Sequence, residues 1–358
     1  MEFVTLTPIW AGGFSSKADR LCETGLLGSM RWWYEVLVRG VGGKACDPNG
    51  DGANKQNKCN FQVENYLKAK DKEKRLRLHE AGLCDVCQLF GAAGWKRRFR
   101  LTVADNTEKD KRSPQRIVID KDKCKANPKN NRQSSWQFPD NPRSGRMELK
   151  LQGLYSDFSP EILEGLLQFI ADWGSLGAKG QMGFGVVRPA GQPADTGPLY
   201  RHLKSLAGNF SSSNSAYDRL PSLQNMFFAR IKVKNNSDKE TFEIKCNLRR
   251  LFDKDTDLQN FVMGTVKRGR MAAKIKMSRP YEGNIIRLWG WIPSKINING
   301  KTWDREDIMK KIHGHMLNNY KLLVWRELGS LRDTVLRSSD PVEFLKSLLA
   351  VKEGENDL

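Results

Sequence analysis

A glycine-rich segment near the middle of the chain constrains its fold more than any other stretch. The segment 173–187 holds five glycines, at positions 174, 177, 180, 183 and 185, around a single lysine, Lys179. An amphipathic helical pattern precedes it, and β-branched residues follow it. Because glycine lacks a Cβ, such a run can turn several backbone N–H groups toward one anion. The segment therefore predicts a loop between a helix and a strand that either binds an anion or is a plain exposed turn.

Nucleic acid is the anion that the composition favours. The segment matches neither the Walker A nor the dinucleotide-binding pattern, because no Gly-Lys-Ser/Thr ends it and a helix precedes it. The chain has a formal net charge of +19, from 60 Lys and Arg against 41 Asp and Glu, and its basic residues are interleaved with aromatic ones. This distribution favours nucleic acid over a membrane surface, and the alternative is charge tuned only for solubility.

Chain length and cysteine content bound the class of protein. The 358 residues exceed the ~250–300 that a single core usually serves, so two domains are expected. No run of 18 apolar residues occurs, and the first residues lack a basic stretch followed by an apolar one. We therefore expect no membrane span, no secretion and a cytoplasmic location. The seven cysteines, an odd number, argue against a disulfide framework.

The first 206 residues predict the order strand, helix, strands, helix, strand. Strands are expected at 3–10, 99–103, 115–119, 146–152 and 184–188. The two helices are expected from a Thr24 cap to Arg39 and from a Ser159 cap to Trp173, with a loop at 121–144. This order is that of a split β-α-β sandwich of the ferredoxin-like type.

The first predicted helix has two different faces. Its apolar residues recur at helical spacing and form the buried face, which holds Leu26, Met30, Trp33 and Leu37. Arg31, Glu35 and Arg39 form a stripe that is predicted to be solvated or to face a ligand. Trp32 lies about 100° around the helix from Trp33 and could belong to either face.

The second half has a loosely similar order of elements after a polar linker at 207–222. Strands are expected near 226–233, 241–248 and 284–292, and helices from about Asp257 and from Asp304. Cys246 is predicted to be a core residue of the second of these strands. We therefore expect a first domain at 1–206 with an insertion at about 42–94, and a second domain at 223–358 with a helical C-terminus.

Four cysteines make the insertion the best candidate for a metal site. Cys84 and Cys87 form a C-x-x-C pair, and Cys46 and Cys59 precede them. Four thiolates can complete a tetrahedral zinc shell, and a metal would organise a polar, loop-rich insertion that has little core of its own. The alternative is two unrelated pairs of reduced cysteines.

Two basic segments are candidate phosphate-binding surfaces. In 95–100, strand alternation places Lys96, Arg98 and Arg100 on one face, while Trp95 and Phe99 either stack on bases or pack in the core. The run 266–279 contains no acidic residue, and its cations are Lys267, Arg268, Arg270, Lys274, Lys276 and Arg279. Because no acid in the run can pair with these charges, a phosphate-facing surface is favoured over a merely solvated one.

Support for catalysis is weak. The four histidines fall in no nucleophile elbow and in no helical H-E-x-x-H pattern. Asp19, beside Arg20 in a polar loop, is the candidate for acid–base chemistry. An enzyme that cleaves RNA with Asp19 is therefore one alternative to a binding protein, and a zinc-stabilised scaffold that contacts proteins is another.

Several motifs together resemble the RAMP proteins of CRISPR systems, and in particular the first-subunit family of the type III-B (Cmr) effector complex. The motifs are Thr7–Gly13, Gly28–Trp33, Arg39–Gly43 with Cys46–Pro48, Leu83–Gly91 with Gly94 and Trp95, and Leu176–Gly185. They cover about the first 190 residues, and Gly269–Lys276 and Leu288–Trp291 extend the resemblance more loosely.

The resemblance implies an α+β fold of two tandem ferredoxin-like (RRM-related) domains, the first with the cysteine-containing insertion, and a glycine-rich loop that helps to form an RNA-binding cleft. It also implies a non-catalytic subunit in antiviral defence, near the guide 3′ end of a ribonucleoprotein filament. Its partners would be single-stranded guide and target RNA and other RAMP subunits, and a different subunit would cleave the target. The usual RRM base-stacking motifs are absent.

The residues expected to contact RNA are the cations of these segments and the central part of the glycine-rich loop. They are Lys17, Arg20, Arg31, Lys96, Arg98, Arg100, Gly177, Lys179, Gly180, Gln181, Lys267, Arg268, Arg270, Lys274, Lys276 and Arg279. The residues expected to hold a structural zinc ion are Cys46, Cys59, Cys84 and Cys87.

Overall fold

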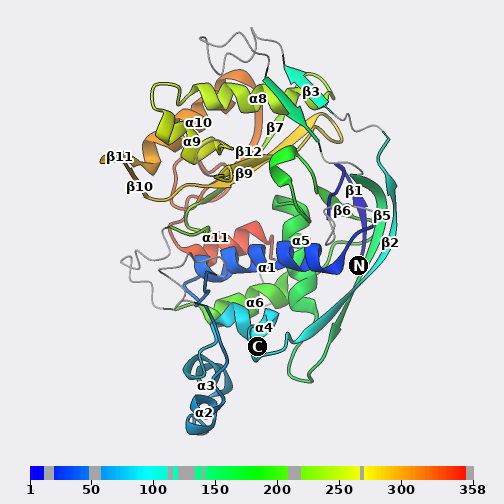
Figure 1. Cartoon of the computed structure of the whole chain (residues 1–358), viewed down its shortest axis with the longest axis vertical. Helices are drawn as coiled ribbons and strands as arrows, with labels where there is room; N and C mark the ends of the chain where they lie inside the picture. Colours follow the sequence, from blue (N-terminus) through cyan, green and yellow to red (C-terminus); the bar gives the residue numbers. More distant parts are fainter. Residues whose placement is uncertain are drawn as a thin grey trace.

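Two four-stranded antiparallel sheets and the helices packed on them make up the molecule (Figure 1). The computed structural model describes residues 1–11, 20–47, 58–111, 116–119, 134–138, 142–208, 219–266 and 270–351. None of the helices in these ranges is long and apolar enough to cross a membrane.

The first sheet has the predicted ferredoxin-like topology. Its strands are β1 (Glu2–Thr5), β2 (Phe99–Lys109), β5 (Arg143–Gly153) and β6 (Val187–Pro189), in the spatial order β2-β5-β1-β6. Helix α1 (Glu23–Gly40) connects β1 to β2, and α5 (Glu161–Trp173) connects β5 to β6. Each helix thus links two parallel strands that are separated by a third, antiparallel strand, which is the split β-α-β arrangement.

The second sheet repeats this topology. It contains β7 (Met226–Lys232), β8 (Ile275–Met277), β9 (Ile285–Trp291) and β12 (Lys321–Arg326), in the order β12-β7-β9-β8. Helices α8 (Asp238–Arg250) and α9 (Thr256–Met263) connect β7 to β8, and α10 (Arg305–Asn319) connects β9 to β12. The α+β, ferredoxin-like fold class is therefore confirmed for both halves, while the domain boundaries at 206 and 223 remain a prediction.

The strand predicted at 241–248 is wrong, because this stretch forms helix α8. The apolar residues alternate because the helix is buried on two sides. Phe242 and Cys246 pack toward Ile117 and Ile119, whereas Ile244 and Leu248 join the core beneath the second sheet. Ser237 caps the helix by accepting a hydrogen bond from the Lys239 N–H. Cys246 is buried as expected, but it is disulfide-bonded, which the odd cysteine count did not suggest.

Several local predictions also differ from the structure. The predicted loop at 121–144 includes a strand, β4 (Ser134–Gln137), which pairs with β3 (Arg116–Ile119). Cys22, not Thr24, is the N-cap of α1, and Pro160, not Ser159, is the N-cap of α5. The insertion contains α2 (Val63–Lys68), α3 (Lys74–Glu80) and α4 (Asp85–Phe90), and α2 and α3 project away from the rest of the molecule (Figure 1).

The remaining described elements complete the two halves. They are the 3₁₀ turn η2 (Gly180–Met182), α6 (Gly197–Leu206), β10 (Lys295–Ile298), β11 (Lys301–Asp304) and α11 (Pro341–Leu348). Although α11 follows the second sheet in sequence, it packs into the core of the first half, where Trp173 Nε1 donates to the Leu348 carbonyl at 2.9 Å.

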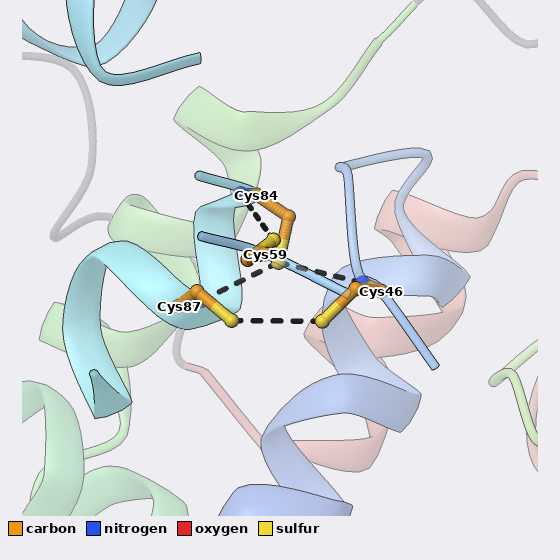
Figure 2. Close-up of side chains that lie close together, drawn as sticks. All are labelled: Cys46, Cys59, Cys84 and Cys87. Carbon is orange, nitrogen blue, oxygen red and sulfur yellow. Dashed lines mark hydrogen bonds between the residues drawn. The ribbon is translucent and has the colours of Figure 1, made fainter. Parts of the chain in front are cut away.

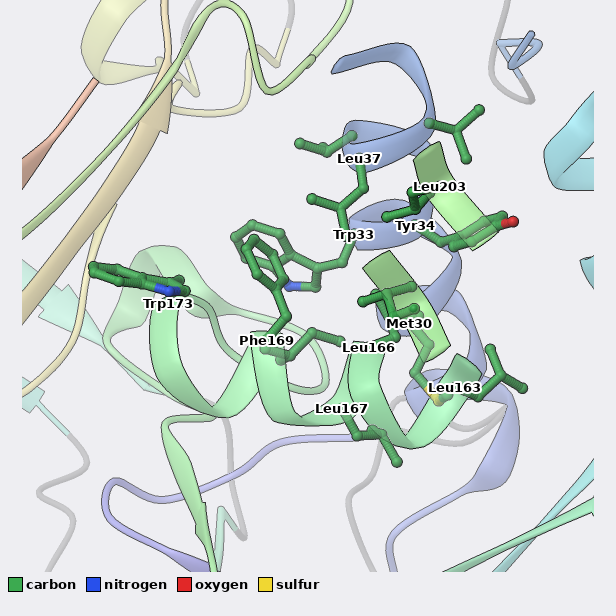
Figure 3. Close-up of a cluster of buried hydrophobic side chains, with 14 of the residues drawn as sticks. Met30, Trp33, Tyr34, Leu37, Leu163, Leu166, Leu167, Phe169, Trp173 and Leu203 are labelled. Carbon is green, nitrogen blue, oxygen red and sulfur yellow. The ribbon is translucent and has the colours of Figure 1, made fainter. Parts of the chain in front are cut away.

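An aromatic interface joins the second sheet to the helices of the first half. Phe228 of β7 is fully buried, with its ring centroid 6.3 Å from Trp33, 6.0 Å from Phe169 and 5.8 Å from Trp173. Figure 3 shows how Trp33 of α1 and Phe169 and Trp173 of α5 lie in this region. The adjacent Phe227 points to the opposite face and stacks on Trp325. The sheet face that a lone ferredoxin-like unit leaves open is therefore covered here.

Replacing Phe228 by Ala should lower the free energy of unfolding by about 3–5 kcal/mol, because the vacated volume between the three surrounding rings cannot close. Denaturant unfolding measures this effect. Leu323, which is 42% exposed on the edge strand β12, supplies the control, since Leu323→Ala should cost less than about 1 kcal/mol. A loss below about 1 kcal/mol for Phe228→Ala would contradict the interface.

Candidate nucleic-acid interface and metal-binding cluster

The glycine-rich loop packs closely against the segment that follows β1. Gly177 has a φ of 80°, and a Cβ there would lie 2.7 Å from the Trp10 carbonyl oxygen. Gly185 has a φ of 90°, and its Cβ would lie only 2.0 Å from the Leu176 carbonyl oxygen. No other residue type fits either position. Lys179 itself adopts left-handed backbone angles (φ 58°), which places its ammonium 4.4 Å from the centroid of the Trp10 ring.

A cleft of about 290 Å³ lies where the glycine-rich loop, α1 and the second sheet meet. Its lining consists of Gly25, Gly28, Ser29, Trp32, Trp33, Ser175, Gly177, Ala178, Lys179, Gly180, Gln181, Lys276 and Trp289. Five of the predicted contact residues therefore come together, namely Gly177, Lys179, Gly180, Gln181 and Lys276. Residues from both halves of the chain contribute, since Lys276 and Trp289 belong to β8 and β9.

The cleft is cationic. The Lys276 ammonium lies 4.8 Å from the centroid of the Trp32 ring, and Lys245 of α8 donates a hydrogen bond to the Gln181 carbonyl. Burial lowers the pKa of Lys276 to about 8 and that of Lys245 to about 7. Among the described residues, the lining includes no aspartate, glutamate or histidine. Lys276 therefore still carries its charge at neutral pH, and no acid of the described lining offsets it.

The other predicted contact residues that the structure describes lie outside this cleft. Arg20, Lys96, Arg100 and Arg270 are exposed elsewhere, and Lys274 lies over the rings of Phe261 and Trp291. Arg98 forms an ion pair with Asp157, and Arg279 is buried in an ion pair with Asp238. Lys17, Asp19, Lys267 and Arg268 lie outside the described residues.

Sequence analysis missed three features of the cleft. Trp289 and Ser29 belong to the motifs Leu288–Trp291 and Gly28–Trp33 that carry the family resemblance, but neither was predicted to contact RNA. Lys245 lies in the stretch that was misassigned as a strand, so no signal in the sequence pointed from it to the glycine-rich loop.

One prediction for the stripe Arg31, Glu35 and Arg39 was that it is solvated. This is wrong, because the insertion covers the stripe. Glu35 and Arg39 are 4% and 3% exposed. Arg31 Nε donates to Glu35 at 3.0 Å, and Arg31 Nη2 lies 3.1 Å from the Cys87 Sγ. The stripe thus faces the four cysteines of the insertion.

Figure 2 shows these four cysteines converging from separate parts of the insertion. The Sγ atoms of Cys46, Cys59, Cys84 and Cys87 all lie within 4.8 Å of one another, and those of Cys46 and Cys87 are 3.5 Å apart. Four sulfurs at ~2.3 Å from a tetrahedral metal ion would be separated by about 3.8 Å. The four thiols can therefore hold a metal ion.

Backbone N–H groups surround the sulfurs of the cluster. The Cys84 N–H donates to the Cys59 Sγ at 3.2 Å, and the Cys84 Sγ accepts from the Cys46 and Cys87 N–H groups at 3.4 Å. Hydrogen bonds of this kind favour the thiolate, which is the form that binds metal. The backbone is thus arranged to support charged sulfurs.

The Lys276 ammonium should lose its proton with a midpoint near pH 8, below the usual lysine value of ~10.4. The pKa is depressed because burial disfavours the charged form, so Lys276 is cationic below pH 8 and neutral above it. NMR of the Cε–Hε groups as a function of pH measures this midpoint, and Lys276→Arg identifies the signal. A Lys276 midpoint at the usual lysine value of ~10.4 would refute its burial.

Comparison with known proteins identifies the family. The sequence model of the RAMP superfamily matches residues 2–188. No curated protein sequence matches the chain. Among solved structures, Cmr1 from Pyrococcus furiosus in its apo form aligns with a TM-score of 0.45 and 13% identity, over 90% of this chain and 97% of that one.

A chain of a type III-B Cmr-beta complex, bound to cognate target RNA and AMPPnP in the presence of single-stranded DNA, aligns with a TM-score of 0.37 and 12% identity, over 88% of this chain and 98% of that one. The family match extends over more than half of the sequence, from β1 through the glycine-rich loop to β6. The chain therefore belongs to the RAMP superfamily.

Proposed function

We propose that this protein is a non-catalytic RNA-binding subunit of a type III-B CRISPR ribonucleoprotein complex. The observation that carries the proposal is the cationic cleft in which Lys179 and Lys276 flank a glycine-rich loop and the Trp32 ring. Cations beside an aromatic ring suit a strand of RNA with unpaired bases, since the cations contact phosphate while the ring stacks on a base. A double helix would not present its bases to such a narrow site.

The proposed partners follow from the family and from the motifs in the sequence. We infer that the RNA is guide or target RNA near the guide 3′ end. We also infer that neighbouring RAMP subunits are the protein partners and that the complex is located in the cytoplasm. RAMP membership supports this inference, as do the motifs that resemble the first-subunit family of Cmr complexes. The net charge of +19 supports binding to a polyanion in any of these arrangements.

The absence of catalysis is part of the proposal. The described lining of the cleft offers hydroxyl, amide and ammonium groups, but no carboxylate or imidazole that could exchange a proton with a ribose hydroxyl. The alternative is an endoribonuclease that uses Asp19. Incubating the purified chain with end-labelled RNA distinguishes the two, because cleavage that Asp19→Asn abolishes would establish the enzyme.

Removing both cleft cations should weaken RNA binding and reduce its salt dependence. For Lys179→Ala with Lys276→Ala, the slope of log K against log salt concentration should become shallower by about 1.4, because each phosphate contact on a single strand contributes about 0.7. Fluorescence polarisation with a labelled single-stranded RNA at several salt concentrations measures this slope.

The charge-matched control for this experiment is Lys150→Ala with Lys295→Ala. Both lysines are exposed and neither lines the cleft, so the slope should stay as in the unmodified chain. Equal effects of the two double variants would mean that RNA binds through diffuse charge and not in the cleft.

We further propose that the cysteine cluster holds a structural zinc ion. A complete set of four sulfur ligands is typical of structural zinc, whereas a catalytic site keeps one position open. Asp85, between the two cysteines of the C-x-x-C pair, accepts hydrogen bonds from the Lys44 N–H and from Arg75 Nε, both at 2.7 Å. The cluster thus connects the insertion to the end of α1, where a metal would stabilise the junction.

Zinc removal should lower the free energy of unfolding by about 4 kcal/mol or more, the effect expected for a ligand at a thousand times its Kd. Elemental analysis should find one zinc per chain, and Cys46→Ser or Cys84→Ser should reduce both zinc content and thermal stability. Cys22 is a free thiol outside the cluster, so Cys22→Ser is the control and should change neither. Protein that is purified without metal and is unaffected by Cys84→Ser would exclude the site.

A further inference from the structure

All three nitrogen atoms of the Arg31 guanidinium have an acceptor within the chain. Nε donates to the Glu35 carboxylate and Nη1 to the Gly91 carbonyl, both at 3.0 Å, and Nη2 donates to the Cys87 Sγ at 3.1 Å. The Cys46 Sγ lies 4.0 Å from the same Nη2. The planar guanidinium is therefore held in one orientation, with one edge directed at two sulfurs of the cysteine cluster.

The cluster concentrates negative charge that the surrounding chain must offset. Four thiolates around a divalent metal ion leave a net negative charge. Glu35, which is 4% exposed, adds another negative charge nearby and pairs with both Arg31 and Arg39. The stripe as a whole is cationic, because two permanently charged guanidiniums flank one carboxylate. Of the two, Arg31 donates to a sulfur, whereas Arg39 donates to the Cys46 carbonyl oxygen at 2.8 Å.

We propose that Arg31 is a positioning residue of the cysteine cluster, whose guanidinium offsets the charge of the thiolates and orients the Cys87 sulfur toward the metal ion. This inference rests on the proposed structural zinc ion and deepens that proposal by adding a residue beyond the four ligands. A hydrogen bond between a cation and a thiolate is roughly twice as strong as one between neutral groups. Partners of this kind typically contribute about 10–100-fold in metal affinity.

In this role Arg31 is not available to RNA. To reach a phosphate, its guanidinium would have to leave Cys87 and Gly91, and the thiolates would lose their cation. The Glu35 carboxylate would also lose one of its two partners while it stays buried, and an incompletely paired buried charge is unfavourable. The cation thus acts within the fold of the chain.

Cobalt(II) supplied in place of zinc reports on the sulfurs through its sulfur-to-metal charge-transfer band. Arg31→Met keeps the length of the side chain and removes its charge and donors. The band should then move to longer wavelength, because a thiolate that loses a hydrogen bond gives up electron density more readily. Zinc affinity, measured by competition with a chelator, should fall about 10–100-fold. A merely structural role of Arg31 would lower stability without moving the band.

Arg98→Met is the matched control. Arg98 is also a partly buried arginine in an ion pair, but its partner is Asp157. Its replacement should change neither the zinc affinity nor the cobalt band.

A pair of polar variants applies if Arg31→Met does not fold. Arg31→Lys keeps the positive charge and Arg31→Gln removes it, so zinc affinity should be higher in the lysine variant than in the glutamine variant. Equal zinc affinities of these two variants would overturn the role of the charge.

The outcomes separate this inference from the proposed zinc site. If the unmodified chain takes up neither zinc nor cobalt, the zinc site itself fails. If it binds both, and Arg31→Met keeps the affinity and the band of the unmodified chain, the site stands and the role of Arg31 is refuted. The salt dependence of RNA binding should be the same in Arg31→Met as in the unmodified chain. A slope shallower by about 0.7 would assign Arg31 to a phosphate and overturn this inference.

Discussion

The packing of the second sheet on the helices of the first half is the constraint on which the rest of the structure depends. Phe228 is enclosed by Trp33, Phe169 and Trp173, and this contact fixes the distance between the two halves. Arg287 of β9 reinforces it by donating to the Gly174 carbonyl at 2.9 Å, just beyond the C-terminus of α5. A cation at this position also compensates the negative end of the helix dipole. The cleft lies beside this interface, between α1, the glycine-rich loop and β8.

This interface also decides where the proposed RNA binding can take place. In a lone RRM-related unit the open face of the sheet is available to stack on bases. Here the corresponding face of the second sheet is covered by α1 and α5, so only its margin at β8, with Lys276, remains accessible from the cleft, while the buried Trp289 of β9 lines the cleft wall. The absence of the usual base-stacking motifs is consistent with this geometry. In the proposed function, RNA is therefore bound at the junction between the halves, where the glycine-rich loop lies, and not on the sheet face.

The fold was more predictable from the sequence than the site was. Element order and the apolar face of α1 depend on local periodicity, and both the topology of the first sheet and the burial of Leu26, Met30, Trp33 and Leu37 were confirmed. Helix α8 was misread because burial on two sides produces alternation in a helix, and periodicity cannot distinguish that from a strand. The lysines of the 266–279 run looked equivalent in sequence, yet only Lys276 lines the cleft among those that the structure describes.

Three consecutive residues of α1 explain why the site could not be read from the sequence. Arg31 contacts the cysteine cluster, Trp32 lines the cleft and Trp33 packs on Phe228, because successive helical residues point about 100° apart. One helix therefore connects the cysteine cluster, the cleft and the interface between the halves. Any rotation of α1 would move Trp32 and Gly28 relative to Lys276, and the hydrogen bonds of Arg31 to the Gly91 carbonyl and to Cys87 resist such a rotation from the opposite side. The cluster lies apart from the cleft, yet it contacts the same helix that lines the cleft.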